Sequence, residues 1–351
     1  RLLRLLLLEA ANGFGLQSPV LVAVVVRDRE RAVVRVGARH GARVQPRAAV
    51  PVHLHARAGA QGRVRLVGVA CGAGVSTGAL IAPFAFLGSE YDESLRAFYT
   101  EISRKDIYRQ RGIVGLLTQP SVADAAPLAE LIAANIDGAI LDAIALEHDS
   151  GRRLLVQTTN LDAGRGMIWD MGAIARSSDP RRLELFRSVL LASASVPGLF
   201  APVMIEVSNG AASFSEMHVD GAVTAGFLAV PESMAISGKM RAGAGQDRIF
   251  IILNGRLRPQ YETVGPSTFA IIERALDTVL SAYDRASLAN VQHFAASNDI
   301  GFAISYIGPE FDVETEELFS QPYMNALYEH GIERGRTGAW SGSLEETAES
   351  R

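Results

Sequence analysis

The sequence has little cysteine, little net charge and no long apolar run, and each of these shortages excludes a class of protein. It holds a single cysteine, Cys71, so neither an internal disulfide nor a metal site built from several cysteines can form. Its longest apolar candidate, Gly78–Gly88, has about half of the roughly 20 residues that a membrane-spanning helix needs. The net charge of -4 provides no overall basic field for nucleic acid.

What is present is enough apolar sequence for a large folded core, together with an uneven distribution of charge. The chain has 351 residues, of which 48% are hydrophobic, and this suits one large α/β domain or two ordinary ones. Between Arg27 and Arg65 ten arginines stand against two acids, a local balance of +8. Because residues 1–26 add +1, residues 66–351 must carry -13 to reach the total of -4.

Two interpretations of the basic stretch stay open. It forms a surface for phosphate or an anionic membrane, or it is a GC-rich coding sequence translated in the wrong frame. We therefore treat residues 1–73 as an atypical N-terminal region, either frame-shifted or poorly ordered.

Apolar periodicity predicts strands and helices that alternate along the rest of the chain. The expected strands are Leu66–Ala70, Arg153–Thr158, Met167–Met171, Met204–Val207, Ser213–Val219, Ile249–Leu253 and Gly301–Tyr306. The expected helices are Ala79–Leu87, Glu90–Ser103, Pro127–Ile136, Asp137–His148, Asp179–Ala194, Thr268–Ala295 and Met324–Arg334. This alternation predicts one α/β domain with a largely parallel central sheet.

The first candidate catalytic motif is a G-x-S-x-G sequence between an expected strand and an expected helix. It consists of Gly74-Val75-Ser76-Thr77-Gly78. Small residues around a serine allow the sharp turn of a nucleophile elbow, which projects the hydroxyl from the sheet edge. The helix that follows presents free N–H groups and the positive end of its dipole, and these favour developing negative charge. The motif therefore predicts that Ser76 is a nucleophile.

A serine nucleophile needs a base, and the residues alone leave several candidates. His218 stands two residues before Asp220, so both side chains would share one face of a strand. His293 and His330 fit the Ser…Asp…His order of α/β-hydrolases, which would make the protein an esterase of that class. The remaining imidazoles are those of His40, His53, His55 and His148.

Three blocks together resemble the patatin-like phospholipase family. They are GVSTGA at 74–79, ASASVPGLFAPV at 192–203 and HVDGA at 218–222, and the segment 158–175 is similar to the family's mid-domain strand pair. The resemblance runs from about residue 74 to about residue 330. It implies an α/β class of protein with a three-layer α/β/α patatin-like fold.

The resemblance also implies a mechanism and a site. A Ser–Asp dyad would act without a histidine, with Ser76 as the nucleophile and Asp220 as the base, and without a metal or another cofactor. The substrate would be a lipid or phospholipid ester. The acyl hydrolase domain would span residues 74–335, followed by a polar C-terminal tail at 336–351.

The sequence departs from the family pattern before the nucleophile. The family places a glycine-rich loop of the form D-G-G-G-x-x-G there, whose N–H groups make the oxyanion hole, whereas residues 1–73 contain no Gly-Gly pair. The backbone N–H of Thr77 would remain as one donor. The alternative function is therefore a catalytically impaired patatin-like protein that binds lipid or serves as a scaffold.

The location of the protein in the cell stays open on sequence alone. The chain begins with Arg1 rather than Met, and Leu2–Leu8 is apolar apart from Arg4, so secretion is not excluded. We expect a soluble or membrane-peripheral protein without a transmembrane helix. Its partners would be a lipid substrate and a membrane surface, not nucleic acid.

Overall fold

The computed structural model describes residues 20–27, 69–110, 121, 123–208, 212–228, 247–257, 261, 263–313 and 319–344. Its strands are β1 (Val20–Arg27), β2 (Val69–Val75), β3 (Arg109–Gln110), β4 (Ala123–Asp124), β5 (Arg153–Asn160), β6 (Arg165–Asp170), β7 (Val203–Ser208), β8 (Ser213–Asp220), β9 (Asp247–Asn254) and β10 (Gly301–Tyr306). Its α-helices are α2 (Thr77–Leu87), α3 (Asp92–Thr100), α4 (Arg104–Ile107), α6 (Ala126–Asn135), α7 (Gly138–Asp149), α8 (Met171–Arg176), α9 (Arg182–Ser193), α11 (Thr268–Ser297) and α12 (Gln321–Thr337). Two short 3₁₀ turns, η1 (Ser89–Tyr91) and η2 (Gly221–Val223), complete the elements.

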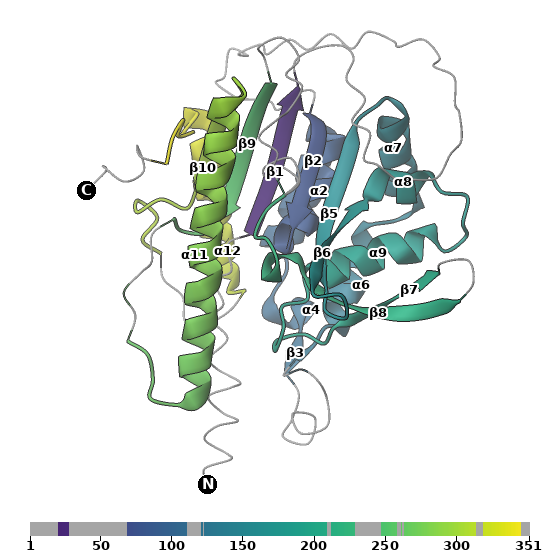
Figure 1. The fold of residues 1–351 in the computed structure, drawn as a ribbon, viewed down its shortest axis with the longest axis horizontal. Coiled ribbons are helices and arrows are strands. Elements are labelled where there is room, and N and C mark those ends of the chain that lie inside the picture. The colour runs from purple at the N-terminus through teal and green to yellow at the C-terminus, as the bar shows by residue number, and fades with distance from the viewer. Residues whose placement is uncertain are drawn as a thin grey trace.

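One large sheet organises these elements (Figure 1). Strands β10, β9, β1, β2 and β5 are neighbours in this order, and β7 pairs with β8 at the other end. Residues 155–160 of β5 pair with β6, while residues 153–157 pair with β2 and residues 158–160 pair with β8. Because β5 has only two edges, β6 occupies one of them, and β2 and β8 lie end to end along the other.

The expected α/β class is confirmed, but the sheet is mixed rather than largely parallel. The parallel pairs are β2 with β5 and β9 with β10, whereas β1 runs opposite to both of its neighbours. The β5–β6 and β7–β8 pairs are antiparallel as well. Only residues 161–164 connect β5 to β6, and so short a connection can join only antiparallel strands.

Helices cover both faces of the sheet, which gives three layers. Leu154 and Val156 of β5 point to one face, where they join a core with α2, α3, α6, α7, α8 and α9. Leu155 points to the other face and packs against a second core, which contains Val75 and Leu288 of α11. The alternation along β5 follows from the period of two residues in a strand. Figure 1 shows α11 in front of β9 and β10 and α12 behind the sheet.

Most expected elements are present, with boundaries that shift by a few residues. The strand expected at Leu66–Ala70 is β2 (Val69–Val75), so it runs directly into the serine motif. The strand expected to reach Met171 ends at Asp170, whose carboxylate caps α8 by accepting the Ala173 N–H.

The two ends of the chain differ from the patterns expected for them. Val20–Arg27 forms a strand that no sequence pattern had indicated, and most of the rest of the atypical region 1–73 lies outside the described residues. At the other end, Ser341 exchanges two backbone hydrogen bonds with Ile304 of β10, and Trp340 packs edge-on against Phe250. This part of the expected polar tail is therefore attached to the sheet.

Among the helices that the structure describes, none combines the length and the apolar character that crossing a membrane requires.

Candidate active site

The serine of the G-x-S-x-G motif lies at a sharp turn between β2 and α2. Ser76 has φ 57° and ψ -134°, a conformation that L-residues rarely adopt, and Thr77 begins the helix. The helix closes over the turn through a hydrogen bond from the Ala79 N–H to the Ser76 carbonyl. Strained serines of this kind occur at nucleophile elbows, and for its shape we call the turn at residues 74–79 the elbow.

Gly74 is required in this turn for a steric reason. A Cβ atom at this position would lie 2.4 Å from the carbonyl oxygen of Gly78 and 2.7 Å from Cα of Ala79. Both contacts are with backbone, which cannot move aside as a flexible side chain could. The first turn of α2 can therefore fold back over β2 only if residue 74 has no side chain.

The two residues that the family resemblance singles out meet in the interior. Ser76 Oγ donates a hydrogen bond to Oδ2 of Asp220 over 2.6 Å. Both residues are buried, with 3% of Ser76 and 2% of Asp220 exposed. The other carboxylate oxygen of Asp220 accepts the Ala222 N–H at 2.8 Å, which fixes the orientation of the carboxylate.

Strand β5 brings the serine and the aspartate together, although 144 positions separate them in the sequence. Val75, the last residue of β2, is in register with Gln157 of β5. Asp220, the last residue of β8, is in register with Thr158, the next residue along the same strand. The end-to-end arrangement of β2 and β8 along one edge of β5 therefore places Ser76 beside Asp220.

Burial changes the acidity of the aspartate. Removal of the carboxylate from water raises the pKa of Asp220 to about 7, and the hydrogen bonds from the Ser76 hydroxyl and the Ala222 N–H oppose this rise. A carboxyl group with this pKa can take up and release a proton near neutral pH. Asp220 is therefore a buried carboxyl group in hydrogen-bond contact with a hydroxyl.

A second hydrogen-bond chain supports the backbone of the elbow. The Ser76 N–H donates to Oγ of Ser193 at 3.1 Å, and the Ser193 hydroxyl donates to the Gln157 carbonyl at 2.7 Å. The Gln157 side chain donates in turn to the carbonyls of Gly221 and Ala225, which follow Asp220. The serine turn and the aspartate turn are thus connected through the last residues of α9 and the middle of β5.

The first turn of α2 offers hydrogen-bond donors beside the serine. The N–H groups at the start of a helix have no intrahelical partner, and the dipole is positive there. The Thr77 hydroxyl is buried without a hydrogen-bond partner in the part of the chain that the structure describes. This environment suits a negatively charged oxygen near Ser76.

The structure places the described histidines in other surroundings. The ring of His218 is buried, lies 2.9 Å from the Thr158 hydroxyl through Nδ1, and has its pKa lowered by burial. The ring of His148 lies 3.5 Å from Asp170, and the ring of His330 lies 3.6 Å from Glu310. His293 is exposed on α11.

Within the described residues, the hydroxyl of Ser76 therefore bonds to Asp220 and its N–H to Ser193, and neither bonds to a histidine. His40, His53 and His55 lie outside the described residues. Most of residues 1–73, where the family pattern places a glycine-rich loop, also lie outside the described residues, apart from β1 and the start of β2.

A second buried carboxylate, which sequence reasoning missed, lies on α11. Asp284 is 5% exposed, and it accepts a hydrogen bond from the Gly226 N–H. Burial raises its pKa to about 7, the Gly226 N–H and Arg285 lower it, and the charge of Asp220 raises it further. A single acid in a long amphipathic helix carries no sequence signal of burial, so only the packing reveals this residue.

Within the described residues, no three histidine, cysteine, aspartate or glutamate side chains converge as a metal site would require. Asp220 and Asp284 are each held by backbone N–H groups, which are donors and not ligands.

Comparison with known proteins agrees with this geometry. A search among curated proteins found no match. The family model described as patatin-like phospholipase matches residues 68–232, a range that contains β2, the elbow, β5 and Asp220. The resemblance noted in the sequence is therefore confirmed over residues 68–232, which match the model of the patatin-like phospholipase family.

Proposed function

We propose that this protein hydrolyses carboxylic esters of lipids, with Ser76 as the nucleophile and Asp220 as the base. The family model supports a lipid acyl hydrolase in general, and the observation that carries the finer proposal is the 2.6 Å hydrogen bond from Ser76 to Asp220. We place this activity in a domain that spans residues 74–335.

The first half of the reaction forms an acyl-enzyme. Asp220 takes the proton of the Ser76 hydroxyl while Oγ attacks the carbonyl carbon of the ester. The carbonyl oxygen becomes negatively charged beside the N–H groups at the start of α2. When the tetrahedral intermediate collapses, the bond to the alcohol breaks, and the alcohol leaves with the proton that Asp220 returns.

The second half repeats these steps with water. Asp220 takes a proton from a water molecule, the water oxygen attacks the acyl group, and Ser76 Oγ leaves with the proton. Asp220 must be ionised for both halves. A base with a pKa of about 7 is ionised in most molecules above neutral pH and protonated in most below it.

We propose further that the protein meets its substrate at a membrane surface, as a peripheral protein. The support is the class of substrate, because phospholipid esters are held in bilayers, and a set of exposed apolar side chains on α11, which is described below.

Replacement of the nucleophile tests the proposal. In Ser76→Ala we expect hydrolysis of p-nitrophenyl butyrate to fall by about 10³-fold or more, because no other group can form the acyl-enzyme. A fluorophosphonate probe should label the wild-type protein at Ser76 and leave Ser76→Ala unlabelled. Ser150→Ala is a matched control, since the Ser150 hydroxyl only donates to the Glu147 carbonyl at the end of α7.

Equal hydrolysis by the wild type and Ser76→Ala would overturn the assignment. One specific observation favours a second function, a catalytically impaired lipid-binding or scaffold protein: residues 1–73 contain no Gly-Gly pair. A wild-type chain that binds lipid but neither hydrolyses the ester nor reacts with the probe would support this second function. Translation of the DNA upstream of codon 74 in all frames would show whether another frame encodes a glycine-rich loop.

A further inference from the structure

Helix α11 is much longer than the strands that it covers. Its 30 residues measure about 45 Å, whereas the eight residues of β9 measure about 26 Å. Its C-terminal part packs on the sheet through Leu288, Val291 and Phe294. Before Asp284 none of the α11 side chains that the structure describes is buried, so this half of the helix extends past the sheet.

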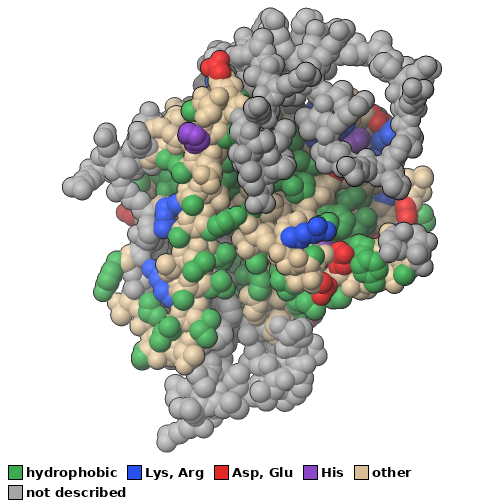
Figure 2. All heavy atoms as spheres, in the orientation of Figure 1, with side chains coloured by type: hydrophobic (Ala, Val, Ile, Leu, Met, Phe, Trp, Pro, Cys, Tyr) green, Lys and Arg blue, Asp and Glu red, His purple; other side chains and the backbone are tan. Residues whose placement is uncertain are grey.

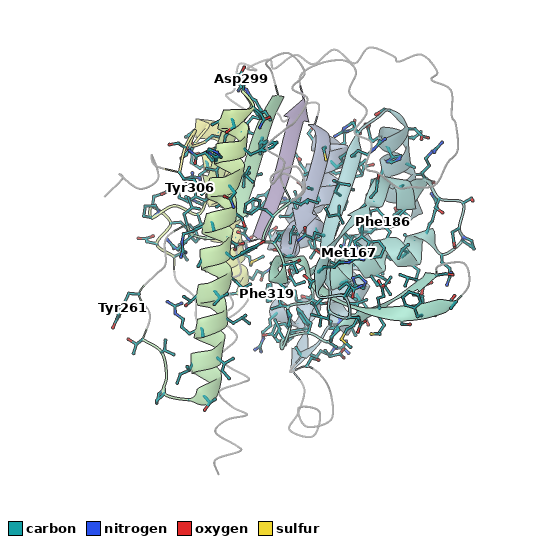
Figure 3. All side chains as sticks on the ribbon, viewed as in Figure 1. Met167, Phe186, Tyr261, Asp299, Tyr306 and Phe319 are labelled. Atoms are coloured by element: carbon teal, nitrogen blue, oxygen red, sulfur yellow. The ribbon has the colours of Figure 1, made fainter. Side chains whose placement is uncertain are left out.

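The extended half lies at the edge of the sheet where the elbow lies. Strands β2, β9 and β10 share one direction, since β1 is antiparallel to both β2 and β9, and β9 is parallel to β10. A helix that connects two parallel strands runs back against them, so the start of α11 lies near the ends of the strands, where Ser76 follows β2. In Figure 3, Asp299 lies at the upper end of α11 and Tyr261 near the opposite end.

This half of α11 is amphipathic with its apolar side outward. Ile272, Leu276, Val279 and Tyr283 follow the spacing of one helix face and are 61%, 44%, 64% and 47% exposed. We call these four residues the α11 stripe. The opposite face carries Arg274 and Asp277, which form an ion pair, and ends at the buried Asp284. A helix that packs on a protein core normally has the reverse arrangement.

The α11 stripe ends one residue before a contact with the segment that follows Asp220. Tyr283 directly precedes Asp284, which holds the Gly226 N–H in the segment that follows Asp220. Figure 2 shows apolar side chains gathered over the lower half of α11. Ile271, Val264 and Tyr261 are also exposed, by 53%, 40% and 96% respectively, so further apolar side chains belong to the same end of the molecule.

We propose that the α11 stripe is the surface through which this protein inserts into the outer layer of a lipid membrane, next to its active site. This rests on the proposed function, because it assigns the membrane contact of the same site. An amphipathic helix with Ile, Leu, Val and Tyr on its outer face suits the boundary between head groups and acyl chains. Tyrosine in particular prefers that boundary.

The α11 stripe by itself, without Ile271, Val264 and Tyr261, is smaller than one side of a stable protein interface. Four side chains of this kind remove at most about 500 Å² of apolar area from water. A stable protein complex buries about 800 Å² on each partner. The span of the stripe, residues 272–283, contains three charged residues, Glu273, Arg274 and Asp277. Arg274 and Asp277 pair with each other on the opposite face, so neither adds charge to the stripe itself. A few inserted apolar side chains are sufficient for reversible membrane binding.

Binding of the full chain to phosphatidylcholine vesicles tests the proposal. We expect Val279→Asp to weaken the partition of the protein onto the vesicles about tenfold, because a carboxylate cannot enter the acyl region without a large desolvation cost. Leu146→Asp on α7 is the matched control, since Leu146 is 72% exposed and the change is the same. It should bind vesicles as the wild type does.

Hydrolysis of soluble p-nitrophenyl butyrate should be the same in both variants, and circular dichroism spectra that match the wild type show that each is folded. Wild-type binding should persist in roughly 0.5 M NaCl, because an apolar contact is not screened by salt. If Val279→Asp weakens vesicle binding, the membrane contact is supported even when the wild type hydrolyses no ester. A missing hydrolytic activity would count only against the proposed function. Unchanged binding of Val279→Asp, or a wild-type dimer in sedimentation that Val279→Asp dissociates, would overturn the proposal.

Discussion

Two buried aspartates, Asp220 at the end of β8 beside the elbow and Asp284 on α11, differ in their hydrogen-bond partners. Asp220 and Asp284 are 2% and 5% exposed, and burial raises the pKa of each to about 7. At the elbow, the hydroxyl of Ser76 lies 2.6 Å from Asp220. On α11, Asp284 accepts its hydrogen bond from the backbone N–H of Gly226.

This difference teaches that a raised pKa marks burial and does not by itself identify a catalytic group. Desolvation is the largest cause of the shift at both sites. A general base also needs a proton donor that takes part in the reaction, and geometry decides this before acidity does. On this ground Asp220 is the candidate base, whereas Asp284 holds the segment 221–228 in place.

The strongest test of the comparison replaces each aspartate by asparagine. Asp220→Asn should lower kcat/KM for p-nitrophenyl butyrate by about 10³-fold, because the amide cannot take the proton of Ser76. Asp284→Asn keeps an oxygen that can accept the Gly226 N–H, and its kcat/KM should stay close to the wild-type value. Both should be compared at pH 8, where the wild-type carboxylates are ionised.

The distinction between Asp220 and Asp284 would be wrong if Asp284→Asn were as inactive as Asp220→Asn while circular dichroism showed both variants to be folded. Asp284 would then take part in proton transfer, and the two carboxylates would have to be treated as one coupled pair.

The two regions should behave alike when stability is measured instead of activity. Unfolded aspartate has a pKa of about 3.9, so between pH 4 and 7 the folded protein binds more protons at Asp284 than the unfolded protein does. The free energy of unfolding should therefore fall as the pH rises through this window and level off above about 7. In Asp284→Asn the fall between pH 5 and 8 should be smaller by about 2 kcal/mol.

Urea midpoints across this pH range would measure that difference, and Asp220→Asn should show one of the same sign. Equal slopes in the wild type and Asp284→Asn would contradict a raised pKa at that residue.

A smaller effect is expected from the hydrogen bonds that surround the elbow. Ser193→Ala leaves the buried Ser76 N–H without its acceptor, and we expect kcat to fall about tenfold with KM little changed. Ser195→Ala is the matched control: Ser195 is equally buried, but its hydroxyl donates to Leu191 one turn before it. If Ser193 positions the elbow, kcat should fall in Ser193→Ala and stay unchanged in Ser195→Ala.

Steady-state kinetics on the soluble ester, together with melting temperatures, would separate the two variants. If both lower kcat and melting temperature equally, the contribution of Ser193 is only to the stability of the fold.

Local patterns in the sequence predicted most of the secondary structure and the sharp turn at Ser76. The Gly74–Gly78 motif gave the elbow because its steric demands are met within five residues. The helical period over Thr268–Ala295 predicted α11 almost to its ends, which lie at Thr268 and Ser297. The choice of Asp220 over the histidines came from resemblance to a family and not from spacing.

The direction of the strands could not be predicted in this way. An apolar run fits a parallel and an antiparallel neighbour equally well, and β1 was not expected at all. Ser193 and Asp284 were missed because their partners lie far away in the sequence and are backbone groups, which leave no trace in the pattern of residue types.

The sequence by itself determined that a strained serine follows a buried strand and that helices and strands alternate around it, because turns and amphipathic periods are local properties. Only the tertiary structure decided that β2 and β8 meet end to end along β5, which places Asp220 beside Ser76. It also decided which half of α11 is buried and which carries its apolar face outward at the edge of the sheet where Ser76 lies. Both outcomes depend on long-range packing, since burial and proximity are properties of the whole fold.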